Sequence, residues 1–250
     1  MSGQKENCTS TGRAALHLHS SHSDGRHTVT DILSHLEATS DLDIVAVTDH
    51  DEISGFQEAL EWKVARPGAR IEPLWGCEIT VQAFKHILAF IFEPPYPTRR
   101  FPSFRPLEET FARVQEAHGV IIIAHPDTFW VGVGLKRLGT LVDRYPVVVG
   151  IEAYNPYCRS APNIEAFARH HNLAIFGGSD AHFMEHMLKY TVLYPGKTAA
   201  DLKQAFFDRT TSVVAGPTSG KVPVREIIAQ QFQALVTHPA HKLKRALQKP

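Results

Sequence analysis

Short apolar runs alternate along this chain with longer segments whose hydrophobic residues have helical spacing. The apolar runs are typical of buried strands, which we predict at 14–20, 43–48, 71–81, 86–92, 120–124, 147–153, 173–176, 191–193 and 212–215. The segments between them predict helices at 28–36, 56–64, 107–118, 134–144, 163–171 and 199–209. Strands separated by helices predict an α/β fold with a parallel sheet, and the number of repeats indicates a closed or nearly closed barrel.

The chain is expected to form one folded domain at residues 14–216. Residues 1–13 are polar and are expected to be a flexible tail, whereas residues 217–250 are expected to form an amphipathic, basic tail that packs on the barrel or extends from it. Residues 93–106 contain five prolines and three arginines, which are Arg99, Arg100 and Arg105. We expect this proline-rich loop to form a rim or a lid.

The composition is that of a soluble globular protein, with 43% hydrophobic and 21% charged residues and without an apolar run long enough for a transmembrane segment. The 26 basic residues balance the 26 acidic residues, which counts against extended nucleic-acid binding. The N-terminal residues lack the apolar core of a signal peptide, and the three cysteines are scattered, so we expect a cytoplasmic protein with reduced thiols. The oligomeric state is left open.

Most of the predicted strands end in a histidine or a carboxylate. His17 and His19 share one face of the first strand because side chains alternate, and the turn that follows returns Asp24 toward them. In a parallel barrel, the C-terminal ends of all strands face one mouth. The candidate metal ligands that gather there are His17, His19, Asp24, His50, Glu78, His86, His125, Asp180 and His182.

This set of side chains favours particular metals. Imidazole nitrogens mixed with carboxylate oxygens, without thiolates, suit Zn, Mn or Fe better than Cu, Mg or Ca. Nine candidate ligands exceed the needs of one ion, so the sequence predicts two or three divalent ions with Glu78 placed to bridge them. Ions in such sites lie roughly 3.5–4 Å apart and assist in-line displacement at phosphorus.

From about Ala14 to Gly216, the chain resembles the PHP domain, the polymerase and histidinol phosphatase superfamily, and especially its small stand-alone phosphoesterases. Several separated motifs carry the resemblance, in the same order: Leu16-His17-Leu18-His19-Ser20 with Ser23-Asp24-Gly25, Thr48-Asp49-His50-Asp51, Gly76-Cys77-Glu78-Ile79-Thr80 with His86, Ala124-His125-Pro126, Gly150-Ile151-Glu152, and Gly178-Ser179-Asp180-Ala181-His182. The proline-rich loop replaces an insertion that many relatives carry, and Asp24 stands where some relatives have histidine.

The resemblance implies a distorted (β/α)7 barrel in which the nine candidate ligands hold a trinuclear site. It also implies that Glu78 and Asp180 contact more than one ion. We therefore expect metal-dependent hydrolysis of a phosphate monoester of a small metabolite, such as a nucleotide or amino-acid phosphate, by attack of a metal-bridging hydroxide.

Residues outside the ligand set are candidates for other roles in this reaction. Arg159 and Arg26 are candidates for gripping the substrate phosphate, together with the three arginines of the proline-rich loop. Asp51 and His22 are candidates for the general acid, and His27 is a further one. Phe129 and Trp130 follow the Ala-His-Pro strand end, where they are expected either to pack or to line the substrate pocket.

Two alternative functions remain open. A phosphodiesterase or exonuclease that trims oligonucleotides is not favoured by the zero net charge, although an open mouth and a basic loop would suit it. A non-catalytic, metal-binding regulatory module could dispense with several ligands, whereas this chain retains the whole set. A phosphomonoesterase is therefore the favoured hypothesis.

Overall fold

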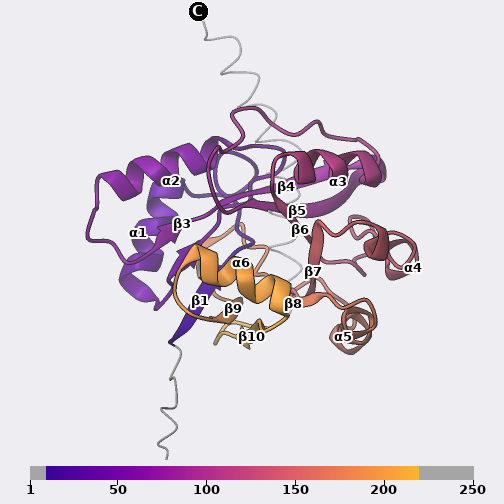
Figure 1. The fold of residues 1–250 in the computed structure, drawn as a ribbon. Coiled ribbons are helices and arrows are strands. Elements are labelled where there is room, and N and C mark those ends of the chain that lie inside the picture. Colours follow the sequence, from indigo (N-terminus) through magenta and orange to yellow (C-terminus); the bar gives the residue numbers. More distant parts are fainter. Residues whose placement is uncertain (1–9, 220–250) are drawn as a thin grey trace, which may run out of the picture.

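The computed structural model describes residues 10–219, which form two five-stranded sheets covered by helices (Figure 1). The first sheet has the order β10-β9-β1-β2-β3, with β1 (Thr11–Ala15), β2 (Ile44–Val45), β3 (Glu72–Pro73), β9 (Tyr190–Pro195) and β10 (Ser212–Ala215). The second has the order β4-β5-β6-β7-β8, with β4 (Trp75–Val81), β5 (Lys85–Ile91), β6 (Val120–Ile123), β7 (Val148–Tyr154) and β8 (Ala174–Gly177). The predicted α/β class is confirmed.

The helices follow the predicted hydrophobic stripes. In α1 the side chains of Val29, Ile32, Leu33 and Leu36 are buried, and the Thr28 hydroxyl caps the helix by accepting from the backbone N–H of Asp31. The helices are α1 (Val29–Thr39), α2 (Ser54–Val64), α3 (Leu107–Glu116), α4 (Leu135–Leu138), α5 (Ala161–His170) and α6 (Ala199–Asp208). Short 3₁₀ helices occur at η1 (Gln82–Phe84), η2 (Val142–Arg144) and η3 (Met184–His186).

Where a helix was predicted at 134–144, the structure has only the single turn α4 and the 3₁₀ turn η2. Glycines bound α4 on both sides, since Gly134 is its N-cap and Gly139 its C-cap. Glycine in a helix loses more conformational entropy than any other residue, so the helix ends there. The prediction of a continuous helix at this place is wrong.

The prediction of a parallel sheet holds for only part of the strands. The pairs β1–β2, β2–β3, β6–β7 and β7–β8 are parallel, whereas β4–β5, β5–β6, β1–β9 and β9–β10 are antiparallel. The three residues of η1 are too few for a parallel crossover, which needs a dozen or more residues, so β4 and β5 form a hairpin. The hairpin places Glu78 opposite Leu88 and Thr80 opposite His86.

Within residues 10–219, strand pairing does not close the sheets into the predicted barrel. The two sheets are joined by isolated parallel bridges, one between His50 and Glu78 and the other between Leu18 and Ala181. Both bridges involve residues at or beside candidate metal ligands. The candidate centre therefore lies where the two sheets meet.

The proline-rich loop packs along β4 and α2 and does not form a separate lid. The ring centroids of Phe101 and Trp75 lie 6.0 Å apart, and those of Tyr96 and Phe56 lie 4.9 Å apart. Arg100 forms an ion pair with the buried carboxylate of Glu52. The loop reaches the β4–β5 turn at its end, where the N–H of Phe104 donates to the carbonyl of Thr80 at 2.7 Å.

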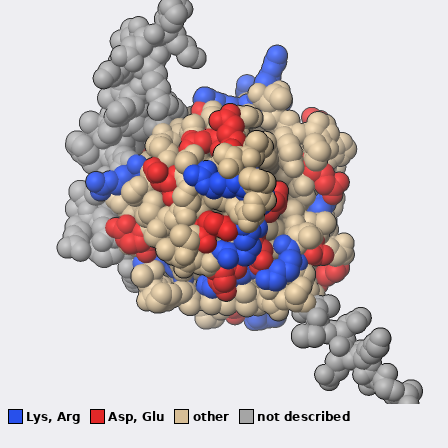
Figure 2. All heavy atoms as spheres, turned by 90° about the vertical axis from the view of Figure 1, so that its left-hand side faces the viewer, with Lys and Arg blue, Asp and Glu red and all other residues tan. Residues whose placement is uncertain are grey.

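The predicted tails fall largely outside the described residues, which exclude 1–9 and 220–250. Strand β1 begins at Thr11, so part of the segment 1–13 that was expected to be a flexible tail belongs to the first sheet. Among the described residues, no helix has the length and apolarity needed to cross a membrane. On the face drawn in Figure 2, acidic and basic side chains are interspersed, in keeping with the zero net charge.

Candidate metal centre

Glu78 is the buried carboxylate around which the candidate centre is arranged. It lies in β4, and its side chain has no solvent exposure. Its two oxygens face different histidines. Oε2 lies 3.1 Å from Nε2 of His17 and of His19 and 3.4 Å from Nδ1 of His50, whereas Oε1 lies 3.0 Å from Nδ1 of His86 and 3.1 Å from Nε2 of His125.

Asp180 is a second carboxylate that faces several histidines. Its Oδ1 lies 3.2 Å from Nε2 of His19 and 3.6 Å from Nε2 of His17, and its Oδ2 lies 3.9 Å from Nε2 of His125. Glu78 and Asp180 thus share three histidine neighbours and contact the same Nε2 atom of each. This placement is the one expected of carboxylates that contact more than one ion.

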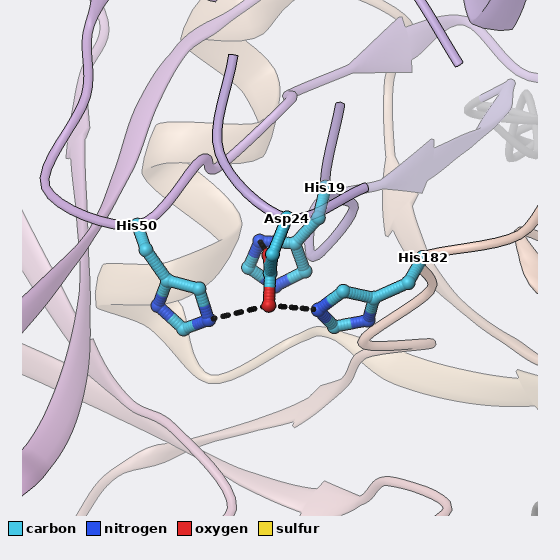
Figure 3. Close-up of side chains that lie close together, drawn as sticks. All are labelled: His19, Asp24, His50 and His182. Carbon is cyan, nitrogen blue, oxygen red and sulfur yellow. Dashed lines mark ion pairs between the residues drawn. The ribbon is translucent and has the colours of Figure 1, made fainter. Parts of the chain in front are cut away.

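Asp24 gathers the remaining histidines, as Figure 3 shows. Its Oδ2 lies 3.2 Å from Nε2 of His182 and 3.9 Å from Nε2 of His50, and these two contacts are the dashed lines of the figure. The ring of His19 stacks on both imidazole rings, with its centroid 4.5 Å from that of His50 and 4.3 Å from that of His182. The turn after His19 therefore does return Asp24 to the pocket.

The structure places eight of the nine predicted ligands in three overlapping groups and the ninth, His125, next to them. In each group, one nitrogen or oxygen per side chain lies within 4.8 Å of the others. The groups are His19, Asp24, His50 and His182; His17, His19, Glu78 and Asp180; and His50, Glu78 and His86. His125 adjoins the last two through its contacts with Glu78 and Asp180. Their role as metal ligands stays a prediction, and the geometry is compatible with two or three ions.

The backbone is in the left-handed region where several strands end at this centre. The φ angles are 52° at Asp51, 24° at His125 and 47° at Asp180. Positive φ is uncommon for residues other than glycine, and such strain tends to be kept at functional sites. Two of these residues, His125 and Asp180, are candidate ligands, and Asp51 directly follows the candidate ligand His50.

Burial and the opposing charges shift the pKa values of the side chains strongly. Burial alone would lower the pKa of His19, but the carboxylates of Asp180 and Glu78 outweigh it and raise the pKa to about 10. Burial also acts to lower the pKa of His17 and of His125, but the neighbouring carboxylates outweigh it and raise both pKa values. Without an ion, His19 therefore carries a proton at neutral pH, and the raised pKa values of His17 and His125 favour their protonated forms beside the carboxylates.

The carboxylates and His50 shift in the opposite direction. Burial would raise the pKa of Asp24 and of Glu78, but the surrounding histidines hold both pKa values well below the usual range. Burial lowers the pKa of His50 to about 4, although Glu78 and Asp24 oppose this effect. His50 is therefore a neutral imidazole at pH 7, which is the form that binds a metal.

The donor set fits divalent cations. Among the described residues, four buried ring nitrogens have no hydrogen-bond partner, namely Nδ1 and Nε2 of His19 and Nδ1 of His50 and of His125. Buried polar atoms are rarely left unsatisfied, and each specific exception needs an explanation, such as a bound ion. Nε2 of His19 lies close to two carboxylate oxygens without the alignment of a hydrogen bond, which is how ligands around a shared ion are arranged.

Glu152 is a functional residue that the sequence-based set of site residues did not include. Its buried carboxylate accepts a hydrogen bond from Nδ1 of His17 at 2.9 Å, from the backbone N–H of His125 at 2.7 Å and from the side-chain amide of Asn155 at 2.9 Å. Such partners fix the tautomer and orientation of a ligating histidine. The sequence does contain a signal for Glu152, because a carboxylate within the apolar run of β7 is expected to be buried and therefore to need hydrogen-bond partners.

Asp49 is a second residue outside that set. Its carboxylate accepts from the backbone N–H of Ser20 at 2.7 Å, from the Ser20 hydroxyl at 2.6 Å and from the Ser23 hydroxyl at 2.5 Å. These bonds hold the turn that carries Asp24. The Thr48-Asp49-His50-Asp51 motif therefore supplies both a candidate ligand and the support for another.

The predicted general acids lie beside the three ligand groups but belong to none of them. Nε2 of His22 lies 2.7 Å from Oε2 of Glu58 on α2. Asp51 follows His50 and accepts a hydrogen bond from the backbone N–H of Thr80 at 2.8 Å. His27 is half-buried, and its carbonyl accepts from the N–H of Ser21 at 2.8 Å. Their role as proton donors stays a prediction.

The predicted phosphate-gripping arginines lie at the surface around the centre. Arg26 is exposed, and its N–H donates to the carbonyl of His182 at 3.0 Å. Arg159 is also exposed, and its guanidinium lies 5.5 Å from the centroid of the Phe129 ring. Arg100 is engaged with Glu52, and Arg105 lies 3.9 Å from Glu109. Arg26 and Arg159 are thus tied to loops that follow the strand ends.

The fold and the centre define an α/β protein with a candidate multi-ion site at its strand ends. Residues 15–209 match the family model of the PHP domain. Since this match spans most of the chain, the chain belongs to the PHP domain family, and the resemblance seen in its motifs is confirmed. No curated protein sequence matches the chain significantly.

Solved structures share the fold at low sequence identity. A two-domain protein from Bacteroides vulgatus that contains a predicted PHP-like metal-dependent phosphoesterase is 20% identical with a TM-score of 0.64, over 82% of this chain and 65% of that chain. PsfC from Pseudomonas syringae is 22% identical with a TM-score of 0.61, over 88% and 98% of the two chains. The lesion-specific endonuclease PfuEndoQ from Pyrococcus furiosus is 15% identical with a TM-score of 0.58, over 89% and 66%. This chain thus spans about two thirds of the length of the first and the third.

Proposed function

We propose that this chain is a metal-dependent phosphoesterase that hydrolyses a phosphate monoester of a small metabolite. The observation that carries the proposal is the buried cluster of six histidines and three carboxylates at the strand ends of a PHP domain. The named function of the Bacteroides vulgatus protein supports the same reaction class. We take the nine side chains to hold two or three ions of Zn, Mn or Fe, as their mixed nitrogen and oxygen donors suggest.

Bound divalent ions would activate water and neutralise charge on the phosphate oxygens. The chain's own residues prepare that chemistry. Glu78 and Asp180 concentrate negative charge between the histidines, and Glu152 holds the ring of His17 in one orientation. Arg159 and Arg26 are exposed cations on the neighbouring loops, where we propose that they attract the phosphate group.

A small substrate is favoured over nucleic acid by the charge of the chain. The formal net charge is zero, and the face drawn in Figure 2 carries interspersed acidic and basic side chains. Nucleic-acid affinity depends mainly on cations that neutralise successive phosphates. The likeness to PfuEndoQ concerns the fold and does not by itself indicate a phosphodiester substrate.

The test combines metal content with two model substrates. Protein purified without chelator is expected to contain two or three divalent ions per chain by mass spectrometry and to hydrolyse p-nitrophenyl phosphate. Chelation is expected to abolish this activity, and Mn²⁺ or Zn²⁺ to restore it. Faster hydrolysis of bis-p-nitrophenyl phosphate would overturn the monoester proposal in favour of a diesterase. A loaded protein that is inert on both substrates and on a panel of nucleotides would instead indicate a regulatory module.

Matched variants connect the activity to the proposed centre. Glu78→Gln and His86→Gln are expected to lower metal content and activity, since each removes a donor from the cluster. His86 is half-buried, so its variant is the safer one for folding. Glu61→Gln is the control, because Glu61 is an exposed carboxylate on α2 outside the cluster. Full metal content and activity in both cluster variants would contradict the assignment.

A further inference from the structure

Four exposed aromatic side chains lie on the loops beside the candidate centre. They are Phe84, Phe104, Phe129 and Trp130, which we call the aromatic rim, and their exposed fractions are 66%, 54%, 64% and 78%. The rings of Phe84 and Phe104 pair with centroids 5.2 Å apart, and those of Phe129 and Trp130 with centroids 4.9 Å apart. Exposed apolar clusters of this kind are typical of surfaces that bind a ligand or another macromolecule.

The aromatic rim is attached directly to the candidate ligands. The loop that carries Phe129 and Trp130 leaves β6 at His125, and the N–H of Thr128 donates to the carbonyl of His125 at 3.1 Å. At the other end of the loop, the carbonyl of Val131 accepts from the N–H of His86 at 3.0 Å. Trp130 is therefore the immediate chain neighbour of a residue bonded to His86.

The loop is also held in place by the loop that follows β7. The carboxylate of Asp127 accepts from the N–H of Arg159 at 2.9 Å and from that of Ser160 at 2.8 Å. The N–H of Gly134 donates to the carbonyl of Pro126 at 2.8 Å and closes the loop. A surface held in one conformation loses less entropy when it binds a ligand.

Two cations flank the exposed rings. The Arg159 guanidinium lies over Phe129, whereas the Lys85 ammonium donates to the carbonyl of Trp130 at 2.7 Å. With Arg159 over Phe129 and Phe129 at the edge of Trp130, the indole ring is the most exposed aromatic surface beside the centre. The surface therefore combines a planar apolar face with positive charge, on a loop whose backbone is hydrogen-bonded to His86 and to His125.

We propose that the aromatic rim binds the base of a nucleotide substrate, which stacks on Trp130 while its phosphate reaches the metal centre. This inference rests on the proposed phosphoesterase function and narrows its substrate to nucleotides. Stacking of a base on an aromatic side chain suits any base, and the flanking cations suit the negative charge of its phosphate. A phosphorylated aliphatic metabolite would leave the rim unused.

Tryptophan fluorescence tests binding directly, because Trp62 and Trp75 are only 2% and 1% exposed and Trp130 is the exposed indole. The Zn-loaded protein is titrated with a non-hydrolysable adenosine phosphonate and with the matching ribose phosphonate, which lacks the base. Trp130 emission is expected to change with the adenosine compound, whose affinity should be about 5- to 150-fold higher, as base stacking contributes. Trp130→Ala is expected to abolish both the signal and the preference.

Control variants and kinetics separate this inference from the proposed function. For each enzyme, kcat/KM is measured with adenosine monophosphate and with ribose 5-phosphate. In Trp130→Ala, the ratio of the first value to the second is expected to fall by the factor that separates the affinities of the two phosphonates in the wild type. Phe207→Ala removes an exposed aromatic on α6 and should leave that ratio intact. Equal affinity of the two phosphonates would overturn the nucleotide inference even if both esters were hydrolysed. Absence of hydrolysis would overturn the proposed function, whereas nucleotide binding would still be tested by the affinities of the two phosphonates.

Self-association through the aromatic rim is the remaining outcome to test. If a second copy of the chain covered the rim, Trp130 emission would change with protein concentration in the absence of ligand. Analytical ultracentrifugation of the wild type and of Trp130→Ala detects such an assembly. A dimer that forms only with Trp130 would overturn the nucleotide inference.

Discussion

Glu152 fixes two candidate ligands without belonging to any of the three ligand groups. It binds Nδ1 of His17 through one oxygen and the backbone of His125 through the other. The orientation of His17, whose Nε2 faces Glu78, therefore depends on a carboxylate on the far side of its ring. Partners of this kind typically change metal affinity or activity by about 10- to 100-fold when they are removed.

Glu152→Gln tests this dependence. The amide keeps the shape of the side chain but presents a donor where the carboxylate accepts, so one hydrogen bond to His17 or His125 has to be lost. We expect Zn²⁺ affinity to fall by about 10- to 100-fold, as measured by competition with a chromophoric chelator. Glu165→Gln is the control, because the partners of Glu165 among the described residues are Tyr154 and Arg169, which are not candidate ligands. An unchanged affinity in Glu152→Gln would show that His17 is oriented by other contacts.

Most of the candidate ligands could be predicted from the sequence because they lie within or next to a predicted strand, whereas Asp24 was placed by the turn that follows His19. His17 and His19 have strand spacing, and Asp180 and His182 repeat it at the end of β8. Glu152 carries the same kind of signal, but its role depends on a histidine 135 residues away. The proton donor could not be located in this way, since the positions of His22 and Asp51 are set by contacts with α2 and β4.

At the scale of elements, the ends of β7 and β8 approach each other more closely than most side chains would allow. Gly178 directly follows β8, and its N–H donates to the carbonyl of Tyr154 in β7 at 2.9 Å. A Cβ atom at Gly178 would collide with Oε1 of Glu152 and lie 2.8 Å from Cβ of His17. The absence of a side chain here is what lets three strand ends meet at the centre.

Gly178→Ala is therefore expected to destabilise the protein and to disturb the centre. Overpacking of a buried site costs about 1–3 kcal/mol, and for a chain of this length that corresponds to a fall in Tm of about 2–12 °C. Differential scanning calorimetry measures the change. Gly68→Ala is the matched control, because a Cβ atom there has no neighbour within 4 Å. Equal Tm values for the two variants would mean that the strand ends can separate without loss.

The elements themselves were predicted better than their directions. The stripe of α1 and the apolar run of β6 appear as expected, because each is set by local spacing. The antiparallel direction of β5 could not be predicted in that way, since β4 and most of β5 are buried on both faces and the direction depends on the tight turn between them. The proline-rich loop was expected at the rim, but Phe101 and Tyr96 anchor most of it on the core around α2 and β4.

At the scale of the whole molecule, the candidate centre joins the two sheets. His17 and His19 follow β1, and His50 follows β2, in the first sheet, whereas Glu78 and His86 belong to β4 and β5 of the second. Within residues 10–219, the β-bridges between the two sheets are the two isolated ones, Leu18 with Ala181 and His50 with Glu78. Ions held by ligands from both sheets would therefore act as cross-links between them.

Metal binding is consequently expected to raise the thermal stability of the whole chain. A ligand present at about 100 times its Kd contributes about 2.7 kcal/mol, which corresponds to a rise in Tm of about 5–11 °C at this chain length. The comparison is made by calorimetry on chelated protein before and after addition of Zn²⁺ or Mn²⁺. His86→Gln is expected to reduce the rise, whereas Glu61→Gln should leave it unchanged.

The same measurement has a pH dependence whose sign follows from the histidine pKa values. In the metal-free protein, His19 has a pKa of about 10 and holds a proton that an ion has to displace, and the raised pKa values of His17 and His125 act in the same direction. Metal affinity therefore increases with pH. We expect the metal-induced rise in Tm to be larger at about pH 8 than at about pH 6. A rise that is equal at both values would mean that these histidines are already neutral before the ion binds, and that the carboxylates hold them less strongly than their distances imply.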